Sequence, residues 1–129
     1  MPAQTAPATV CVVGRTVLIV DDHAHFRSAA RALLEADGFD VVGEAGDGTS
    51  ALAAVAALQP EIVLLDIHLP DLDGFAVAER LVDDDMAPRI VLTSSRDITS
   101  FRRRLAANPA WSFIPKSELS GDALAAAAG

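Results

Sequence analysis

Lysine and cysteine are scarce in this 129-residue sequence, and each scarcity limits what the chain can do. Lys116 is the single lysine among ten basic residues, so any role that needs a compact ammonium group falls to that position. Cys11 is the single cysteine. A lone cysteine excludes an intramolecular disulfide framework and favours a reducing compartment such as the cytoplasm.

Long apolar runs are missing as well. No run approaches the ~20 residues that a membrane-spanning helix requires, and the stretch 10–20 is interrupted by Gly14 and Arg15. The N-terminus has neither the basic region nor the apolar core of a signal peptide. We therefore expect a soluble cytoplasmic protein that does not contact a membrane.

Positive charge is in short supply: 18 acidic and 10 basic residues give a formal net charge of −8. Proteins that hold nucleic acid by its phosphates need clustered Lys and Arg, so we expect no direct nucleic-acid binding by this chain. The hydrophobic share of 51% is too high for a disordered chain, and the length fits one domain. We expect an N-terminal tail over residues 1–15, whose first nine residues are rich in Ala, Pro and Thr, and a single domain over residues 16–129.

Short apolar runs alternate with segments whose apolar residues recur at helical spacing. Runs that are apolar throughout are typical of strands buried on both faces of a parallel sheet. Five strands alternating with five helices predict an α/β fold with helices covering both faces. The expected strands are 16–22, 41–45, 61–66, 89–95 and 112–116, and the expected helices lie around 26–34, 52–59, 75–82, 98–105 and 118–128.

Polar side chains stand at the ends of four of these strands. Asp21 and Asp22 end the first strand and Asp66 ends the third. Thr93 lies near the end of the fourth, and Lys116 ends the fifth. Ligands of such folds bind beyond the carboxyl ends of the strands, so we expect these side chains to share one site.

Three carboxylates, a hydroxyl and an ammonium group together suggest phosphoryl chemistry. Carboxylate oxygens suit Mg²⁺, and an ammonium group suits a phosphate. A carboxylate can also attack phosphorus and form an aspartyl phosphate. The sequence has no glycine-rich nucleotide-binding loop, so the phosphoryl group is expected to come from another molecule.

Four segments carry a resemblance to a known family: VLIVDDH (17–23), LDIHLPDLDGF (65–75), IVLTSS (90–95) and FIPKSEL (113–119). In their order and spacing they resemble the receiver domain of two-component response regulators. The resemblance covers the chain from about residue 16 onwards. It implies a flavodoxin-like, doubly wound (βα)5 fold with a five-stranded parallel sheet in the order 2-1-3-4-5.

The resemblance also implies a role for each site residue. A sensor histidine kinase or a small phosphodonor would phosphorylate the acceptor, and the chain would catalyse only its own phosphorylation and dephosphorylation. The surface of helix 4, strand 5 and helix 5 would then switch. The implied residues are Asp66 as phosphoacceptor, Asp21, Asp22, Asp66 and the backbone carbonyl of His68 as Mg²⁺ ligands, Lys116 as phosphoryl partner, and Thr93 with Phe113 as switch residues.

The segments VDDHAHFRSAARALLE and VVGEAGDGTSAL resemble one branch of the family in particular, which usually carries a C-terminal LuxR-type helix-turn-helix. The sequence ends at Gly129, after the last expected helix. We expect either a single-domain regulator or the receiver part of a longer transcription regulator. Whether two copies of the chain form a homodimer is left open at this point.

Several alternatives remain at this point. The chain is either a phosphorylation switch or a phosphorylation-independent docking module. An aspartate phosphatase is disfavoured because His68 stands where such enzymes carry a second Asp. His68 either influences the phosphoryl lifetime or is merely exposed, and His23 is either a surface residue or a transition-metal ligand. The run 102–104 is a solvated helix face or a partner surface, and Trp111 is expected to pack rather than bind a ligand.

Overall fold

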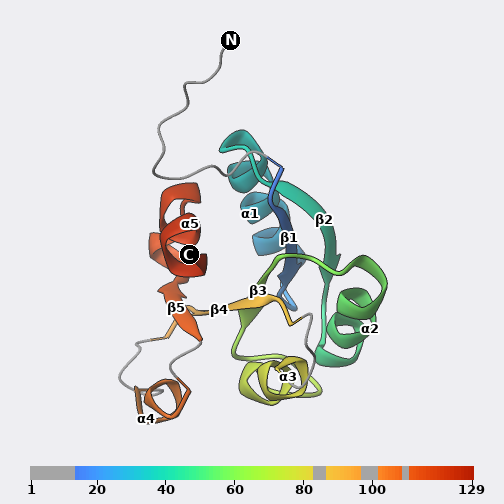
Figure 1. Cartoon of the computed structure of the whole chain (residues 1–129), viewed down its shortest axis with the longest axis vertical. Helices are drawn as coiled ribbons and strands as arrows, with labels where there is room; N and C mark the ends of the chain where they lie inside the picture. Colours follow the sequence, from blue (N-terminus) through green and yellow to red (C-terminus); the bar gives the residue numbers. More distant parts are fainter. Residues whose placement is uncertain (1–13, 83–86, 97–101, 109–110) are drawn as a thin grey trace.

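The computed structural model describes residues 14–82, 87–96, 102–108 and 111–129. Within these residues, five strands alternate with five α-helices, and a short 3-10 helix precedes the last helix (Figure 1). The strands are β1 (Thr16–Val20), β2 (Asp40–Ala45), β3 (Ile62–Asp66), β4 (Arg89–Ser94) and β5 (Ser112–Pro115). The helices are α1 (Ala24–Ala36), α2 (Gly48–Leu58), α3 (Gly74–Leu81), α4 (Arg102–Ala106), η3 (Lys116–Glu118) and α5 (Gly121–Ala128).

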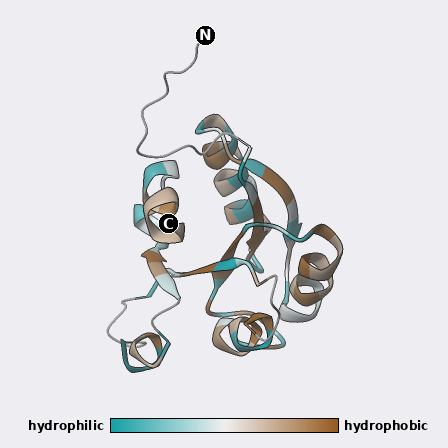
Figure 2. Cartoon of the chain, in the orientation of Figure 1, coloured by the Kyte–Doolittle hydropathy of each residue, from teal (hydrophilic) through white to brown (hydrophobic). Residues whose placement is uncertain are grey.

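All strand pairs are parallel, and the sheet order is β2-β1-β3-β4-β5. This confirms the predicted doubly wound fold. Side chains alternate across each strand, so Val17 and Ile19 face α1 and α5 while Leu18 and Val20 face α2 and α3. Figure 2 shows apolar residues along the central strands, where both faces are covered. Two hydrophobic clusters therefore hold the sheet rigid between its helices.

Some predicted element bounds were wrong by a few residues. The first strand ends at Val20 rather than at residue 22, because the Asp21 carboxylate accepts the backbone N–H of His23 and turns the chain. The last helix begins at Gly121 rather than at residue 118, because the chain first forms η3 and the Ser120 hydroxyl then caps the helix. The second helix begins at Gly48, four residues earlier than predicted, where the Asp47 carboxylate caps it.

The α4 region differs from its prediction in one respect. The guanidinium of Arg104 lies 4.0 Å from the centroid of the Phe75 ring and 3.2 Å from Asp73 Oδ2. Arg104 is thus a contact between α4 and α3 rather than a purely solvated side chain. Trp111 is buried with its ring centroid 5.9 Å from that of Phe75, which confirms its packing role. Residues 98–101 of the predicted fourth helix and residues 1–13 of the predicted tail lie outside the described residues.

Gly14 and Arg15, the last two residues of the predicted tail, form backbone hydrogen bonds with the domain. The backbone N–H of Gly14 donates to the carbonyl of Gly38, and the carbonyl of Arg15 accepts the N–H of Asp40. Among the described helices, none combines the length and the apolar content that crossing a bilayer requires.

Candidate functional site

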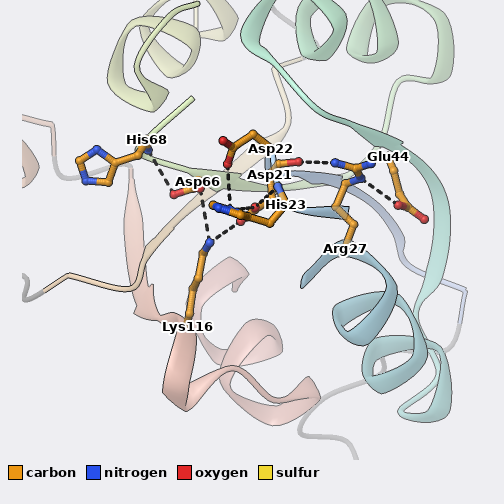
Figure 3. Close-up of polar contacts among 8 residues, drawn as sticks. All are labelled: Asp21, Asp22, His23, Arg27, Glu44, Asp66, His68 and Lys116. Carbon is orange, nitrogen blue, oxygen red and sulfur yellow. Dashed lines mark hydrogen bonds and ion pairs between the residues drawn. The ribbon is translucent and has the colours of Figure 1, made fainter. Parts of the chain in front are cut away.

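The carboxyl ends of β1, β3 and β5 bring the predicted acidic and basic side chains together (Figure 3). From β1 the chain runs outward to β2 and then returns to β3 on the other side, so the crevice between β1 and β3 is the point where the winding reverses. Asp21 follows β1, Asp66 ends β3, and Lys116 follows β5. The sheet order, rather than nearness in sequence, builds this site.

Asp21 is fully buried and is held at both of its carboxylate oxygens. Its Oδ1 accepts the backbone N–H of His23 at 2.8 Å, and its Oδ2 lies 2.5 Å from Lys116 Nζ. Nη1 of Arg27 donates to the backbone carbonyl of Asp21 at 2.6 Å, while Nε of Arg27 donates to Glu44. His23 and Lys116 therefore fix the carboxylate of Asp21, while Arg27, which is anchored on Glu44 of β2, fixes its backbone.

Asp66 is 2% exposed, so its charge is separated from bulk water. Burial raises the pKa of Asp66 and the charge of Asp21 raises it further, whereas the backbone N–H of His68 and the nearby Lys116 oppose the rise. The two opposing contacts measure 3.1 Å from His68 N to Oδ1 and 3.4 Å from Lys116 Nζ to Oδ2. These donors favour the ionised carboxylate that a nucleophile needs.

Lys116 is the counter-charge of the site. Burial by itself would lower the pKa of Lys116, but hydrogen bonds and charge interactions with Asp66 and Asp21 outweigh burial and raise it. Its ammonium also lies 4.5 Å from the centroid of the Phe26 ring, which shields it from water on one side. The single lysine of the chain is thus a protonated group directed at two buried carboxylates.

Thr93 lies beside Asp66. It is the register partner of Asp66 on the neighbouring strand, so the two side chains leave the sheet on the same face. Thr93 is fully buried, and its hydroxyl has no hydrogen-bond partner among the described residues. Phe113, the second predicted switch residue, is partly buried on β5 and packs against the cluster that covers one face of the sheet. It is the register partner of Leu92, one residue before Thr93.

The loop after Asp66 is folded back against it. The backbone N–H of Gly74 donates to the carbonyl of Ile67 at 2.7 Å. A Cβ at Gly74 would overlap the carbonyl oxygen of Asp66 and the Cα of Ile67, so only glycine allows this approach. The same loop is tied to α2 by Asp71, whose carboxylate accepts the backbone N–H groups of Gly48 and Thr49.

The donor set fits a small divalent cation. One ligand atom from each of Asp21, Asp22, His23 and Asp66 can be chosen so that all four lie within 4.8 Å of one another. Carboxylate oxygens are the ligands that Mg²⁺ prefers, and the exposed Asp22 leaves the site open to water ligands. The carbonyl of His68 as a further ligand stays a prediction.

Residues 17–128 match the profile of one protein family, described as the response regulator receiver domain. The chain belongs to that family. The match covers both the acidic pair after β1 and the lysine after β5, so the site lies wholly within the receiver domain.

Related proteins agree with this assignment. The transcriptional regulatory protein PdtaR of Mycobacterium tuberculosis is 36% identical over 103 residues, which cover 77% of this chain and 50% of PdtaR. A LuxR-family two-component response regulator from Aurantimonas sp. SI85-9A1 has 28% identity and a TM-score of 0.73, covering 81% of this chain and 75% of that one. The signal receiver domain of a modulated diguanylate cyclase from Desulfovibrio desulfuricans G20 has 33% identity and a TM-score of 0.70, with coverage of 84% and 86%. The receiver domain spans about half the length of the curated relatives it matches.

Three supporting residues of the receiver domain were missed by sequence reasoning. Arg27 holds the backbone of Asp21, Phe26 covers Lys116, and Asp71 caps α2. Phe26 and Arg27 lie in the first turn of the helix that follows the acidic pair. This position close to the acidic pair is the only sequence signal that could have pointed to them. Asp71 stands in a Pro- and Asp-rich loop where nothing in the sequence distinguishes a capping carboxylate from a solvated one.

Proposed function

We propose that residues 16–129 form a phosphorylation switch in which Asp66 accepts a phosphoryl group from a sensor histidine kinase or a small phosphodonor. The observation that carries this proposal is a buried carboxylate, directed at the carboxyl edge of the sheet, with Lys116 Nζ between it and Asp21. A structural role alone does not require a buried acid and its counter-ion at this edge. The family membership supports the same function.

In the proposed step the Asp66 carboxylate attacks phosphorus in line with the leaving group. A P–O bond forms to Asp66 while the P–N bond of a phosphohistidine, or the P–O bond of acetyl phosphate, breaks. The leaving imidazole or acetate takes the bonding electrons. A bound Mg²⁺ would supply positive charge that stabilises the transferring group.

Lys116 and Thr93 hold the product in this proposal. The ammonium of Lys116 pairs with one phosphoryl oxygen, and the buried hydroxyl of Thr93 donates to another. Moving Thr93 toward the phosphoryl group makes room into which Phe113 rotates, which alters the surface of α4, β5 and α5. We propose that this surface controls transcription through a DNA-binding partner domain, by analogy with the regulatory relatives, and that the protein acts in the cytoplasm.

Intact-mass measurement after incubation with acetyl phosphate and Mg²⁺ tests the proposal. We expect a mass increase of one phosphoryl group in the wild-type protein and none in Asp66→Asn. Asp40→Asn, which changes an exposed carboxylate at the start of β2, should be labelled like the wild type. Absence of label in the wild type, or label in Asp66→Asn, would refute the proposed acceptor. If Asp66→Ala also bound the partners of the wild-type protein with unchanged affinity, the protein would be better described as a phosphorylation-independent docking module.

A further inference from the structure

We propose that His23 is a ligand of the same cation through its Nδ1 atom, and that it shifts the selectivity of the site toward transition-metal ions such as Mn²⁺ and Co²⁺. This inference rests on the proposed function, because it concerns the cation site beside Asp66. The imidazole of His23 lies against the carboxylates that are expected to hold the ion (Figure 3).

The distances around His23 match those between neighbouring ligands of one ion. Its Nδ1 lies 3.0 Å from Asp22 Oδ1 and 3.1 Å from Asp21 Oδ1. In an octahedral site with bonds of about 2.1 Å, adjacent ligand atoms are about 3.0 Å apart and opposite ones about 4.2 Å. The four ligand atoms of the cluster span at most 4.8 Å, which requires only small side-chain rotations to reach that geometry.

The backbone of His23 is fixed beside the carboxylates. His23 is the N-cap residue of α1 and has an extended backbone conformation. Its N–H donates to Asp21 Oδ1 at 2.8 Å, so the start of the helix and the buried carboxylate move together. The His23 side chain is 69% exposed, whereas that of Lys116 is 15% exposed. Lys116 therefore approaches the carboxylates from the buried side and His23 from the solvent side, where an ion exchanges a water ligand for nitrogen most easily.

A second observation indicates that this end of the sheet is shaped for a ligand. The buried hydroxyl of Thr93, next to Asp66 in register, has no hydrogen-bond partner in the described part of the chain. A buried hydroxyl without a partner is costly unless a bound group satisfies it. The carboxylate cluster and this hydroxyl flank the same acceptor.

Nitrogen ligands change which ions a site prefers. Mg²⁺ binds oxygen ligands and keeps several waters, whereas imidazole suits first-row transition metals. A site made of carboxylates alone gains little selectivity for Co²⁺ or Mn²⁺ over Mg²⁺ beyond the general affinity order. With His23 as a ligand, the affinities for Mn²⁺ and Co²⁺ rise while the affinity for Mg²⁺ stays nearly the same.

Electron spin-echo spectroscopy of bound Mn²⁺ detects a directly coordinated imidazole nitrogen through its ¹⁴N modulation. We expect this modulation in the wild-type protein and its loss in His23→Ala. In titration calorimetry, His23→Ala should weaken Co²⁺ binding about tenfold or more and change Mg²⁺ binding far less. His25→Ala removes an exposed imidazole two residues further along and should change none of these readouts. Equal urea midpoints for the three proteins would show that folding is preserved.

Each outcome separates this inference from the proposed function. If ¹⁴N modulation is absent in the wild type or persists in His23→Ala, or if the wild type binds no Mn²⁺, His23 is not a ligand and only hydrogen-bonds the carboxylates. Normal acetyl-phosphate labelling in Mg²⁺ would then leave the phosphoacceptor role of Asp66 intact. If ¹⁴N modulation depends on His23 but Asp66 is never labelled, the metal ligand stands and the proposed function fails.

Discussion

At the scale of a single residue, Gly74 controls the space behind Asp66, the proposed phosphoacceptor. The added methyl group in Gly74→Ala would meet the Asp66 carbonyl and the Ile67 backbone, neither of which can rotate away. We expect this variant to lose about 1–3 kcal/mol of unfolding free energy, as overpacked positions do. We also expect it to accept phosphoryl from acetyl phosphate more slowly, because the carbonyl next to the nucleophile is displaced. Urea denaturation and the rate of mass labelling measure the two effects.

Gly46→Ala is the matched control for this prediction. Its new methyl group would lie 3.4 Å from Nη1 of Arg27, an ordinary van der Waals contact. This variant should be as stable as the wild type or slightly more stable, since alanine reduces the freedom of the unfolded chain. Equal losses in Gly74→Ala and Gly46→Ala would show that the close approach at Gly74 is unimportant.

Asp71 connects two elements, the loop after β3 and the helix α2. Its Oδ1 accepts the N–H of Gly48 at 2.7 Å, and its Oδ2 accepts the N–H of Thr49 at 3.0 Å and the Thr49 hydroxyl at 2.8 Å. These donors lower the pKa of Asp71 well below its ordinary range, so the carboxylate is ionised at the positive end of the helix.

Removing this connection should loosen both elements. In Asp71→Ala we expect a lower urea midpoint and faster amide hydrogen exchange at Gly48 and Thr49, because their N–H groups lose their acceptors. Asp71→Asn keeps one acceptor oxygen, so its urea midpoint and exchange rates should lie between those of the wild type and Asp71→Ala. Asp40→Ala, an exposed carboxylate at the start of β2, serves as the control. Unchanged exchange at Gly48 in Asp71→Ala would contradict the capping role.

The elements could be predicted from the sequence more fully than the contacts between them. Asp66 could be placed at the sheet edge because it directly follows a buried apolar run, and parallel strands end at one edge. Two contacts could not be predicted, because each depends on how a helix is rotated about its axis. These are the contact of Arg27 with the Asp21 backbone and that of Arg104 with Phe75. Periodicity identifies the buried face of a helix but not the partner of each polar residue at its border.

Over the whole molecule, the acidic excess is distributed unevenly. Three acids gather at one edge of the sheet with the only lysine, while Arg27, Arg31 and Arg104 form ion pairs with glutamates and an aspartate elsewhere. In the proposed function the lysine lies where an anion of changing charge has to be held, since its ammonium acts as a point charge. The pairs of Arg27 and Arg31 with Glu44 and of Arg104 with Asp73 instead join neighbouring elements.

The pair of Glu44 and Arg31 makes the stability of the whole domain depend on pH. Arg31 Nε donates to Glu44 Oε2 at 2.7 Å, across the gap between α1 and β2. Hydrogen bonding by Arg31 lowers the pKa of Glu44 below its ordinary value of 4.5, with burial opposing and Arg27 assisting. Because the folded pKa is the lower one, the stabilisation is complete above the ordinary value and is lost as pH falls through the folded value.

A double-mutant cycle of Glu44→Gln and Arg31→Gln, measured by urea unfolding, isolates this pair from the other carboxylates that titrate in the same range. At neutral pH we expect a coupling free energy of about 1 kcal/mol or less, as is usual for partly exposed pairs. The coupling free energy should fall toward zero as Glu44 becomes protonated in acid. It is measured over the pH range in which all four proteins of the cycle are folded in the absence of urea. A coupling that stays constant from neutral pH into acid would show that the pair does not link folding to pH. One that grows on acidification would reverse the expected sign, because it would mean that the folded state binds the proton more tightly than the unfolded chain does.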